Sequence, residues 1–328
     1  MRVASAPRYG GGHMARCLVV ARAIRPRARV QFMLCGQDDA CWRQRLVDEG
    51  FDWCIAGTVS RVDASLVLID HYEELRQPLH RWRRNGAKIA VFDDFDVLAG
   101  RCDLQLLPVG PLPDAAGRQD TLRLGGFDYA PLAPAFCEWP REPAMPLARE
   151  ILVSFGLRDG PGASLLALEA LVDAGMDARF MCTIGSLSPH AGRLKALAAR
   201  HPGRVELLID HPNMAALYAT ADLAVGGGGV AALERAAAGL PGIAVAIADN
   251  QEPALAALDA AGAVSYLGPY AALEIRMLVE RFTTMSSDLC ARQRMSDAGR
   301  QVIDGHGAAR IADALLALAG GWDMAQRG

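Results

Sequence analysis

Two glycine-rich turns carry most of the residues in this sequence that could do chemistry. The first turn, Gly10-Gly11-Gly12, is followed directly by His13, where an opening strand is predicted to meet a helix. Glycines let backbone N–H groups approach a ligand closely, and the start of a helix adds a partial positive charge. We therefore predict that Gly11 and Gly12 line a site for an anionic ligand.

His13 stands at this positive helix end, which disfavours the imidazolium form of its ring. A neutral imidazole accepts a proton from a hydroxyl group or from water, so His13 is a candidate general base. The alternative is a first-turn histidine that only hydrogen-bonds to its own backbone. The spacing fits neither Gly-x-x-x-x-Gly-Lys-Ser/Thr nor Gly-x-Gly-x-x-Gly, which disfavours a P-loop enzyme and a Rossmann dehydrogenase.

The second turn, Gly226 to Gly229, lies between a predicted strand over 222–226 and a predicted helix over 229–239. A strand that enters a helix through glycines forms a diphosphate cradle from backbone N–H groups, with no metal ion required. Glu234 lies about one and a half turns into the helix. From there its carboxylate can reach both hydroxyls of a ribose. Alone, Glu234 would be a surface glutamate, but its combination with the turn indicates a nucleotide site.

Polar side chains also follow three predicted strands, in the pairs Asp70 and Tyr72, Asp93 and Asp94, and Asn250 and Gln251. The carboxyl ends of parallel strands meet at one edge of a sheet, where open α/β sheets bind ligands. Amides at such an edge can donate to sugar hydroxyls or to phosphate. The alternative for the aspartates and for Asn250 is that each only caps the helix that follows it.

Strands and helices alternate along the chain, which predicts parallel sheets with crossover helices. In the first half the predicted strands are 29–35, 65–69 and 88–92, and the predicted helices are 13–25, 39–49 and 73–84. In the second half the strands are 151–155, 178–184, 205–209, 222–226 and 243–247, and the helices are 163–174, 191–200, 213–220, 229–239 and 251–261. Both halves therefore belong to the α/β class.

We predict two Rossmann-like domains, 1–145 and 146–328, that face a central cleft, since 328 residues exceed one ordinary core. The segment 108–146 is rich in Pro and Gly and supplies a long connection or the linker. Further helices are predicted over 271–283, 286–303 and 308–320. These terminal helices could pack back on the first domain.

Composition narrows the classes of partner. With 34 basic and 37 acidic residues the formal net charge is −3, which provides no field that would attract nucleic acid. The eight cysteines include no Cys-x-x-Cys pair, which favours free thiols over a metal site. No apolar run reaches the ~20 residues that span a bilayer. We expect a cytoplasmic monomer that uses a small-molecule substrate and neither a cofactor nor a metal.

Five segments form a more specific combination: Gly-Gly-His13-x-x-Arg16-Cys17-Leu18, Asp70-His71-Tyr72, the glycine turn with Glu234, Gly239-Leu240-Pro241 and Asn250-Gln251. Together, over roughly 9–262, they resemble the UDP-2,4-diacetamido-2,4,6-trideoxy-β-L-altropyranose hydrolase of pseudaminic acid biosynthesis. That family is similar to GT-B glycosyltransferases, particularly the transferase that adds N-acetylglucosamine to the lipid-linked peptidoglycan precursor. The resemblance implies a GT-B fold.

The resemblance also implies a reaction, which is hydrolysis of the anomeric C–O bond of a UDP-sugar. His13 would activate water, Tyr72 and Asn250 would position the sugar or the water, and the segment Ile209 to Met214 would border the uracil. The candidate catalytic residues are His13, Asp70, Tyr72 and Asn250. The candidate substrate-binding residues are Gly11, Gly12, Arg16, Asp94, Phe155, Gly156, Leu157, Met214, Gly228, Gly229, Val230, Glu234 and Gln251.

One loop departs from the family. Many members carry Phe-Gly-Gly-Ser-Asp-Pro where this chain has Phe155-Gly156-Leu157-Arg158. The missing second glycine restricts this loop and affects which sugar fits. Two alternatives to the hydrolase remain, namely a glycosyltransferase in which His13 activates an acceptor hydroxyl, and a non-catalytic subunit that binds a nucleotide sugar.

Overall fold

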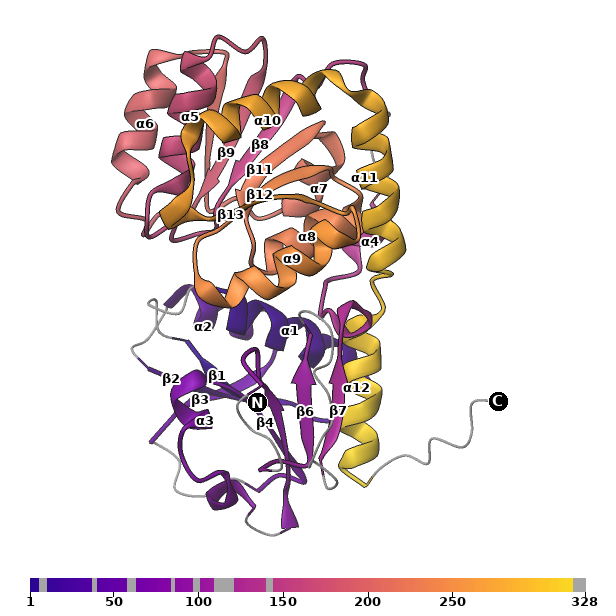
Figure 1. The fold of residues 1–328 in the computed structure, drawn as a ribbon. Coiled ribbons are helices and arrows are strands. Elements are labelled where there is room, and N and C mark those ends of the chain that lie inside the picture. The colour runs from indigo at the N-terminus through magenta and orange to yellow at the C-terminus, as the bar shows by residue number, and fades with distance from the viewer. Residues whose placement is uncertain are drawn as a thin grey trace. The chain divides into compact units, whose positions relative to one another are not determined.

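The computed structural model describes residues 1–5, 11–36, 40–57, 63–83, 86–96, 101–108, 121–139 and 144–320 (Figure 1). The chain divides into two compact units. Unit 1 comprises Met1–Leu132 together with His306–Gly328, and unit 2 comprises Ala133–Gly305. Each unit contains one parallel sheet with helices on both faces.

Unit 1 contains the seven-stranded sheet, in the order β3-β2-β1-β4-β5-β6-β7. Its strands are β1 (Arg2–Ala4), β2 (Gln31–Cys35), β3 (Asp52–Ile55), β4 (Leu66–Asp70), β5 (Lys88–Phe92), β6 (Leu104–Leu107) and β7 (Leu122–Gly125). Its helices are α1 (Gly12–Ile24), α2 (Ala40–Asp48), α3 (Tyr72–Leu75) and α12 (Gly307–Leu318), with the 3-10 helices η2 (Leu79–Trp82) and η4 (Phe127–Tyr129).

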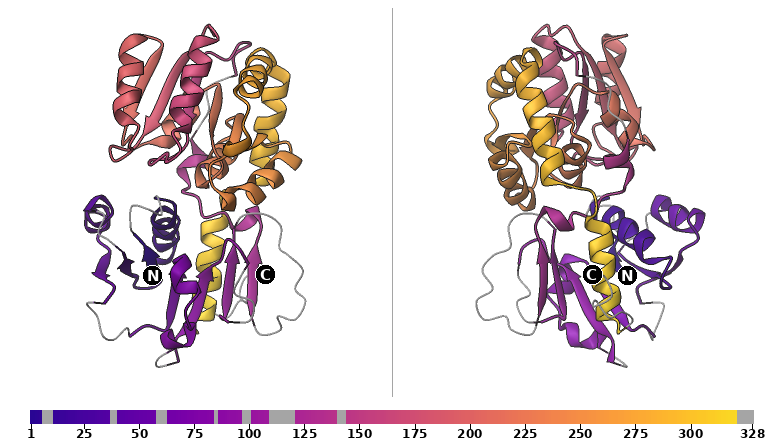
Figure 2. Two further views of the ribbon diagram at one scale, coloured as in Figure 1. Left: turned by 60° about the vertical axis from the view of Figure 1, so that its left-hand side comes forward. Right: turned by 90° about the vertical axis from the view of Figure 1, so that its right-hand side faces the viewer.

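Alternate residues of each strand in unit 1 pack on opposite faces of the sheet. Leu68 of β4 contributes to a core with α1, α2 and α12, whereas Val67 and Ile69 contribute to a core with α3 and η2. A strand buried on both faces reads as a continuous apolar run, which is why β4 was recognisable in the sequence. Figure 2 shows α12, in yellow, beside the strands of this sheet.

Unit 2 contains the six-stranded sheet, in the order β10-β9-β8-β11-β12-β13. Its strands are β8 (Glu150–Ser154), β9 (Arg179–Ile184), β10 (Val205–Ile209), β11 (Leu223–Gly227), β12 (Gly242–Ala246) and β13 (Ser265–Pro269). Its helices are α4 (Ala135–Glu138), α5 (Ala163–Asp173), α6 (Ala191–Arg200), α7 (Met214–Thr220), α8 (Val230–Ala238), α9 (Glu252–Ala260), α10 (Ile275–Ser287) and α11 (Leu289–Val302), with the 3-10 helices η5 (Asp249–Gln251) and η6 (Tyr270–Ala272).

Both faces of this sheet are also covered. Ile151 and Val153 of β8 pack with α5, α6 and α10, whereas Leu152 packs with α7 and α8. The strand order reverses direction between β8 and β11, which leaves the loops after these two strands adjacent. Such a switch point is the usual ligand site of an open parallel sheet.

The helices and strands predicted in the second half agree with the structure to within a few residues. Other elements differ from the prediction. The predicted helix over 73–84 is instead the short helix α3 followed by η2, because Pro78 lacks an N–H and disfavours a helical residue before it. The strands β3, β6, β7 and β13 were not predicted, since each is short and three have partly exposed residues.

The division into units differs from the expected boundary between residues 145 and 146. The chain passes from unit 1 to unit 2 between Leu132 and Ala133 because Phe136 of α4 packs against α7 and α8. It returns to unit 1 between Gly305 and His306. The reason is that α12 packs on α1 and buries Ile311 in the core of unit 1.

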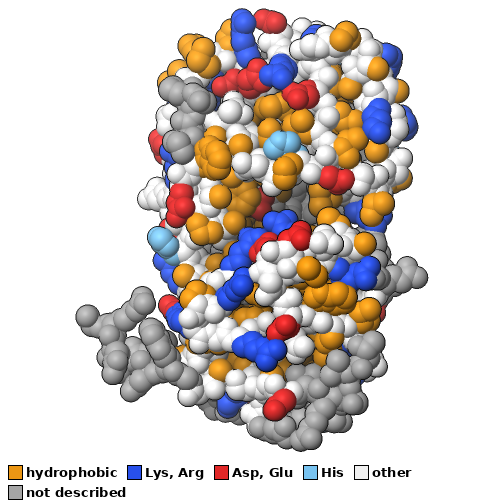
Figure 3. Space-filling model, turned by 180° about the vertical axis from the view of Figure 1, so that it is seen from behind, with side chains coloured by type: hydrophobic (Ala, Val, Ile, Leu, Met, Phe, Trp, Pro, Cys, Tyr) orange, Lys and Arg blue, Asp and Glu red, His pale blue; other side chains and the backbone are white. Residues whose placement is uncertain are grey.

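Basic, acidic and hydrophobic side chains are interspersed over the face drawn in Figure 3. Within the part of the chain that the structure describes, no helix is long and apolar enough to cross a membrane.

Candidate functional site

The first candidate group lies at the carboxyl edge of the sheet in unit 1. His13 is in the first turn of α1, and Asp70 is the last residue of β4. The distance between His13 Nδ1 and Asp70 Oδ1 is 2.6 Å, and the Asp70 side chain is 0% exposed. The topology brings these residues together because α1 follows β1, which pairs with β4.

Arg16 joins Asp70 to Asp94. It lies one turn after His13 on the same face of α1. Both of its terminal nitrogens and its Nε donate hydrogen bonds to these two carboxylates. Arg16 Nε donates to Asp70 Oδ2 at 2.6 Å and Nη2 donates to Asp70 Oδ1 at 2.6 Å. Nη1 and Nη2 donate to Asp94 at 2.8 and 3.0 Å. One guanidinium therefore holds two carboxylates in a bidentate manner.

The charges in this group stabilise one another. Burial alone would raise the pKa of Asp70, but the Arg16 guanidinium and the His13 ring hold it well below its usual range. Burial alone would lower the pKa of Arg16, but Asp70 and Asp94 raise it well above its usual value. Since an ionised carboxylate can only accept, His13 Nδ1 donates to Asp70. With Nδ1 as the donor, Nε2 is the ring nitrogen that can accept a proton.

Tyr72 completes the group in unit 1. Its hydroxyl donates to Asp94 Oδ2 at 2.7 Å, and burial and Asp94 raise the pKa of that hydroxyl above its usual value. Its ring meets the ring of His13 edge to face, with the centroids 4.7 Å apart. The structure therefore brings five predicted residues into one connected network: His13, Arg16, Asp70, Tyr72 and Asp94. In the chain, His13 comes directly after Gly11 and Gly12.

The second candidate group is the glycine turn after β11 in unit 2. Packing requires glycine at two of its positions. A β-carbon at Gly226 would lie 2.3 Å from the carbonyl oxygen of Ser154, and one at Gly228 would lie 2.4 Å from Leu255 Cδ1. A β-carbon at Gly229 would come only to 3.7 Å of Gln251 Nε2. Gly229 is the residue that precedes α8.

Gln251 ties this turn to the end of β12. Its Oε1 accepts from the N–H of Gly228 at 3.1 Å and from the N–H of Ile247 at 3.0 Å. The sequence predicts that the N–H of Gly228 binds a diphosphate. In this structure that N–H donates to Gln251 instead. The first N–H groups of a helix have no partner within the helix, which leaves the start of α8, at Val230, as the nearest anion-binding feature.

Glu234 lies beside two residues that the sequence analysis did not identify. Tyr218 Oη donates to Glu234 Oε2 at 3.1 Å, and Arg235 Nη2 donates to the carbonyl oxygen of Gly227 at 2.7 Å. Burial raises the pKa of Glu234 to about 7, although Tyr218 and Arg235 act in the opposite direction. Arg235 was visible as the neighbour of Glu234, but nothing local indicated Tyr218.

The remaining predicted residues of unit 2 lie around the same edge of the sheet. Phe155 is buried, and its Cα would lie 3.6 Å from a β-carbon on Gly227, so the loop after β8 adjoins the glycine turn. Gly156 has φ +95°, which favours glycine, and Leu157 is 51% exposed. Met214 is the first residue of α7, and Asn250 lies in η5.

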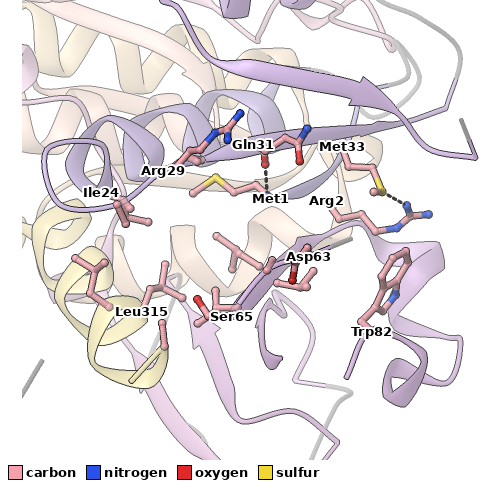
Figure 4. A pocket seen from close by; sticks show the side chains of 18 residues that line it. Met1, Arg2, Ile24, Arg29, Gln31, Met33, Asp63, Ser65, Trp82 and Leu315 are labelled. Carbon is pink, nitrogen blue, oxygen red and sulfur yellow. Dashed lines mark hydrogen bonds between the residues drawn. The ribbon is translucent and has the colours of Figure 1, made fainter. Parts of the chain in front are cut away.

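The cavity drawn in Figure 4 lies elsewhere. It has a volume of about 490 Å³ and is lined at the amino ends of β1, β2 and β4 by residues such as Arg2, Gln31 and Leu66, together with Leu315 of α12. Asp70 is at the opposite end of β4. The cavity is therefore separate from the network around His13. Among the described residues no group of three His, Cys, Asp or Glu is arranged to hold a metal ion.

Comparisons with known proteins bear on the fold. No family model matches the chain. It is 26% identical over 190 residues to the spore coat polysaccharide biosynthesis protein SpsG of Bacillus subtilis. This match covers 57% of the chain and 56% of SpsG, so the chain spans about half the length of that relative.

Three solved structures are similar over nearly the whole chain. MurG of Acinetobacter baumannii has a TM-score of 0.65 at 16% identity and covers 97% of this chain and 99% of its own. Anabaena HepE, in complex with UDP and glucose, has a TM-score of 0.63 at 14% identity, with 96% and 98% covered. The spinosyn rhamnosyltransferase SpnG, complexed with thymidine diphosphate, has a TM-score of 0.63 at 15% identity, with 96% and 100% covered. These similarities confirm the expected GT-B fold.

Proposed function

We propose that this protein transfers the glycosyl group of a UDP-sugar to an acceptor hydroxyl, with His13 as the general base. The single observation that carries the proposal is the 2.6 Å contact between His13 Nδ1 and the fully buried, ionised Asp70. A carboxylate in this position orients the imidazole, selects its tautomer and stabilises the imidazolium that forms when Nε2 takes a proton.

The network around this pair supports the same role. Arg16 keeps Asp70 ionised, and it also holds Asp94, which accepts from the Tyr72 hydroxyl. Such a group would be preorganised, because little has to move when the proton is transferred. Tyr72 and Asp94 would then orient the hydroxyls of the sugar or of the acceptor.

Unit 2 would bind the nucleotide. The start of α8 after Gly229 would receive the diphosphate on its N–H groups, and the charge that develops on the departing UDP would be stabilised there. Glu234 would accept from the ribose hydroxyls, and the segment from Ile209 to Met214 would border the uracil. The complexes of HepE with UDP and glucose and of SpnG with thymidine diphosphate support a nucleotide sugar as the donor.

A transferase is the form of this reaction that the relatives favour. SpnG is a rhamnosyltransferase, and SpsG takes part in the biosynthesis of a polysaccharide, a process that joins sugars to one another. In this form His13 removes the proton from a hydroxyl of the acceptor, whose oxygen then attacks the anomeric carbon.

Hydrolysis is the second candidate. The motifs around His13, around Asp70 to Tyr72 and around Glu234 resemble the UDP-sugar hydrolase of pseudaminic acid biosynthesis. Here water would take the place of the acceptor hydroxyl, and the products would be UDP and a free 2,4-diacetamido-2,4,6-trideoxy sugar. The same base serves both reactions, so the acceptor distinguishes them.

The decisive experiment measures UDP release from a panel of UDP-sugars by the parent protein and by His13→Ala, with and without added sugar acceptors. A transferase releases UDP rapidly only when an acceptor is present, whereas a hydrolase needs none. In both cases His13→Ala should still bind the UDP-sugar in calorimetry but lose turnover. Equal turnover by the parent and His13→Ala would refute the base, and tight binding without turnover by the parent would indicate a non-catalytic subunit.

A further inference from the structure

Phe95 is an exposed aromatic residue next to the network of unit 1. It follows β5 in the turn Asp93 to Asp96, and 52% of it is exposed. Its ring centroid lies 5.3 Å from that of Tyr72, at an angle of 64°. Tyr72 in turn meets His13 edge to face. Three rings thus follow one another from the candidate base outward.

Side chains of β6 and β7 hydrogen-bond to the turn that carries Phe95. Gln105, which is 0% exposed, donates from Nε2 to Asp93 Oδ2 at 2.7 Å and to Asp96 Oδ1 at 2.9 Å. Arg123 donates to Asp96 Oδ1 at 2.7 Å and to Gln105 Oε1 at 2.9 Å. Asp96 has φ +53°, a left-handed conformation that persists in a non-glycine residue where its surroundings impose it.

This arrangement points to a ligand. The hydrogen bonds of the turn hold the Phe95 ring in a fixed position at the surface, and a ligand that covers this ring gains the free energy of burying its apolar face. The Tyr72 ring that Phe95 contacts carries a hydroxyl, which donates to the Asp94 carboxylate. Hydrogen-bonding groups around an aromatic face suit a pyranose, which has an apolar C–H face and a rim of hydroxyls.

We propose that Phe95 and Tyr72 form a carbohydrate subsite that binds the C–H face of a pyranose ring beside His13. The proposal rests on the proposed function, because a sugar must approach the base for transfer or hydrolysis. The pyranose is the sugar of the donor or the sugar of the acceptor, and both present the same chemistry to the two rings. Phe95 would determine specificity for pyranoses with an unobstructed C–H face.

Direct binding tests the subsite without any catalysis. Saturation-transfer NMR would be recorded with methyl β-D-glucopyranoside as the probe, on the parent, Phe95→Ala, Phe95→Trp and Leu122→Ala. Leu122 is the matched control, since it lies in the same unit and is 49% exposed. We expect protons of one sugar face to saturate in the parent, Phe95→Trp and Leu122→Ala, and binding about tenfold weaker in Phe95→Ala. No saturation in the parent, or equal binding by the parent and Phe95→Ala, overturns the subsite.

Kinetics with UDP-glucose identify which sugar is bound. If Phe95 holds the donor sugar, Phe95→Ala raises the KM for UDP-glucose severalfold and leaves the affinity for UDP unchanged. If Phe95 holds the acceptor, only the KM for the acceptor rises. Both results support the subsite. A parent that releases no UDP from any UDP-sugar, but still binds the glucoside through Phe95, refutes the proposed function and leaves the subsite standing.

Discussion

The two candidate groups of this protein are built in opposite ways. In unit 1, charged side chains are tied to one another, since Arg16 binds Asp70 and Asp94 and Asp70 binds His13. In unit 2, a backbone turn is shaped by packing, and its polar atoms are N–H groups and the amide of Gln251. Burial there raises the pKa of Glu234 and lowers the pKa of Arg235, so both groups are displaced toward their neutral forms.

This difference suggests a division of labour. Proton transfer needs a base whose tautomer and position are settled beforehand, and buried ion pairs provide this rigidity. Binding a diphosphate needs donors without a fixed counter-charge, which a glycine turn and a helix start supply. Variants in unit 1 should therefore affect turnover, whereas variants in unit 2 should affect affinity for the nucleotide.

The largest expected effect is in unit 1. Asp70→Asn should reduce turnover about 10³- to 10⁴-fold, because an amide neither selects the tautomer of His13 nor stabilises its imidazolium. Affinity for UDP, measured by calorimetry, should not change. Cys17→Ala is the control, since the Cys17 thiol contacts the same carboxylate at 3.5 Å without contributing charge. A variant Asp70→Asn that keeps a tenth of the parent turnover would contradict the role of the carboxylate.

The glycine turn should show the converse pattern. Gly228→Ala forces a β-carbon against Leu255 and should weaken UDP binding about tenfold, since the turn must shift to accommodate it. Gly192→Ala, in α6 of the same unit, is the matched control, because its β-carbon would meet no atom within 4 Å. We expect Gly192→Ala to bind UDP within about twofold of the parent. If both variants bind equally well, packing at 228 does not shape the cradle.

Glu234 should make nucleotide binding depend on pH. Its pKa of about 7 means that the carboxyl is neutral below pH 7 and ionised above it, and the carboxylate is the better acceptor for ribose hydroxyls. Affinity for UDP-glucose, whose diphosphate stays ionised, should rise severalfold between about pH 6 and pH 8. Glu234→Gln should remove this dependence. An unchanged pH profile in Glu234→Gln would exclude the residue from the ribose site.

The same residue gives a stability test that needs no ligand. The pKa of Glu234 is raised in the folded protein, so its contribution to stability is present below its unfolded pKa and is lost as pH rises through about 7. Thermal unfolding should therefore show that Glu234→Gln gains stability relative to the parent between pH 5 and pH 8, in buffers of matched ionic strength. A constant difference between the two proteins would show that the carboxyl titrates normally.

The smallest effect is expected at Tyr72. Tyr72→Phe removes the hydrogen bond to Asp94 but keeps the ring against His13, and should lower turnover about two- to tenfold. Tyr72→Ala, which also removes the ring, should have a larger effect in the same steady-state assay. Equal losses in the two variants would assign the whole contribution to the hydroxyl.

The sequence alone determined the features that are local. Apolar runs predicted the long central strands, and the glycines before His13 and before Val230 predicted where strands turn into helices. Short strands such as β6 and β7 were not predicted because four residues show too little periodicity to identify a strand. Gly-rich turns were visible because their backbone geometry depends on residues that are adjacent in the chain.

Only the tertiary structure determined which side chains are hydrogen-bond partners. Arg16 donates to Asp70 and Asp94, which are 54 and 78 residues away in the chain. Tyr218 of α7 donates to Glu234 of the neighbouring helix α8. Gln251 accepts a hydrogen bond from the N–H of Gly228, although the sequence predicts that both residues bind the substrate. Periodicity reports which face of an element a residue occupies, but the order of strands in the sheet determines what stands opposite. That order depends on the packing of the whole unit, which no local pattern encodes.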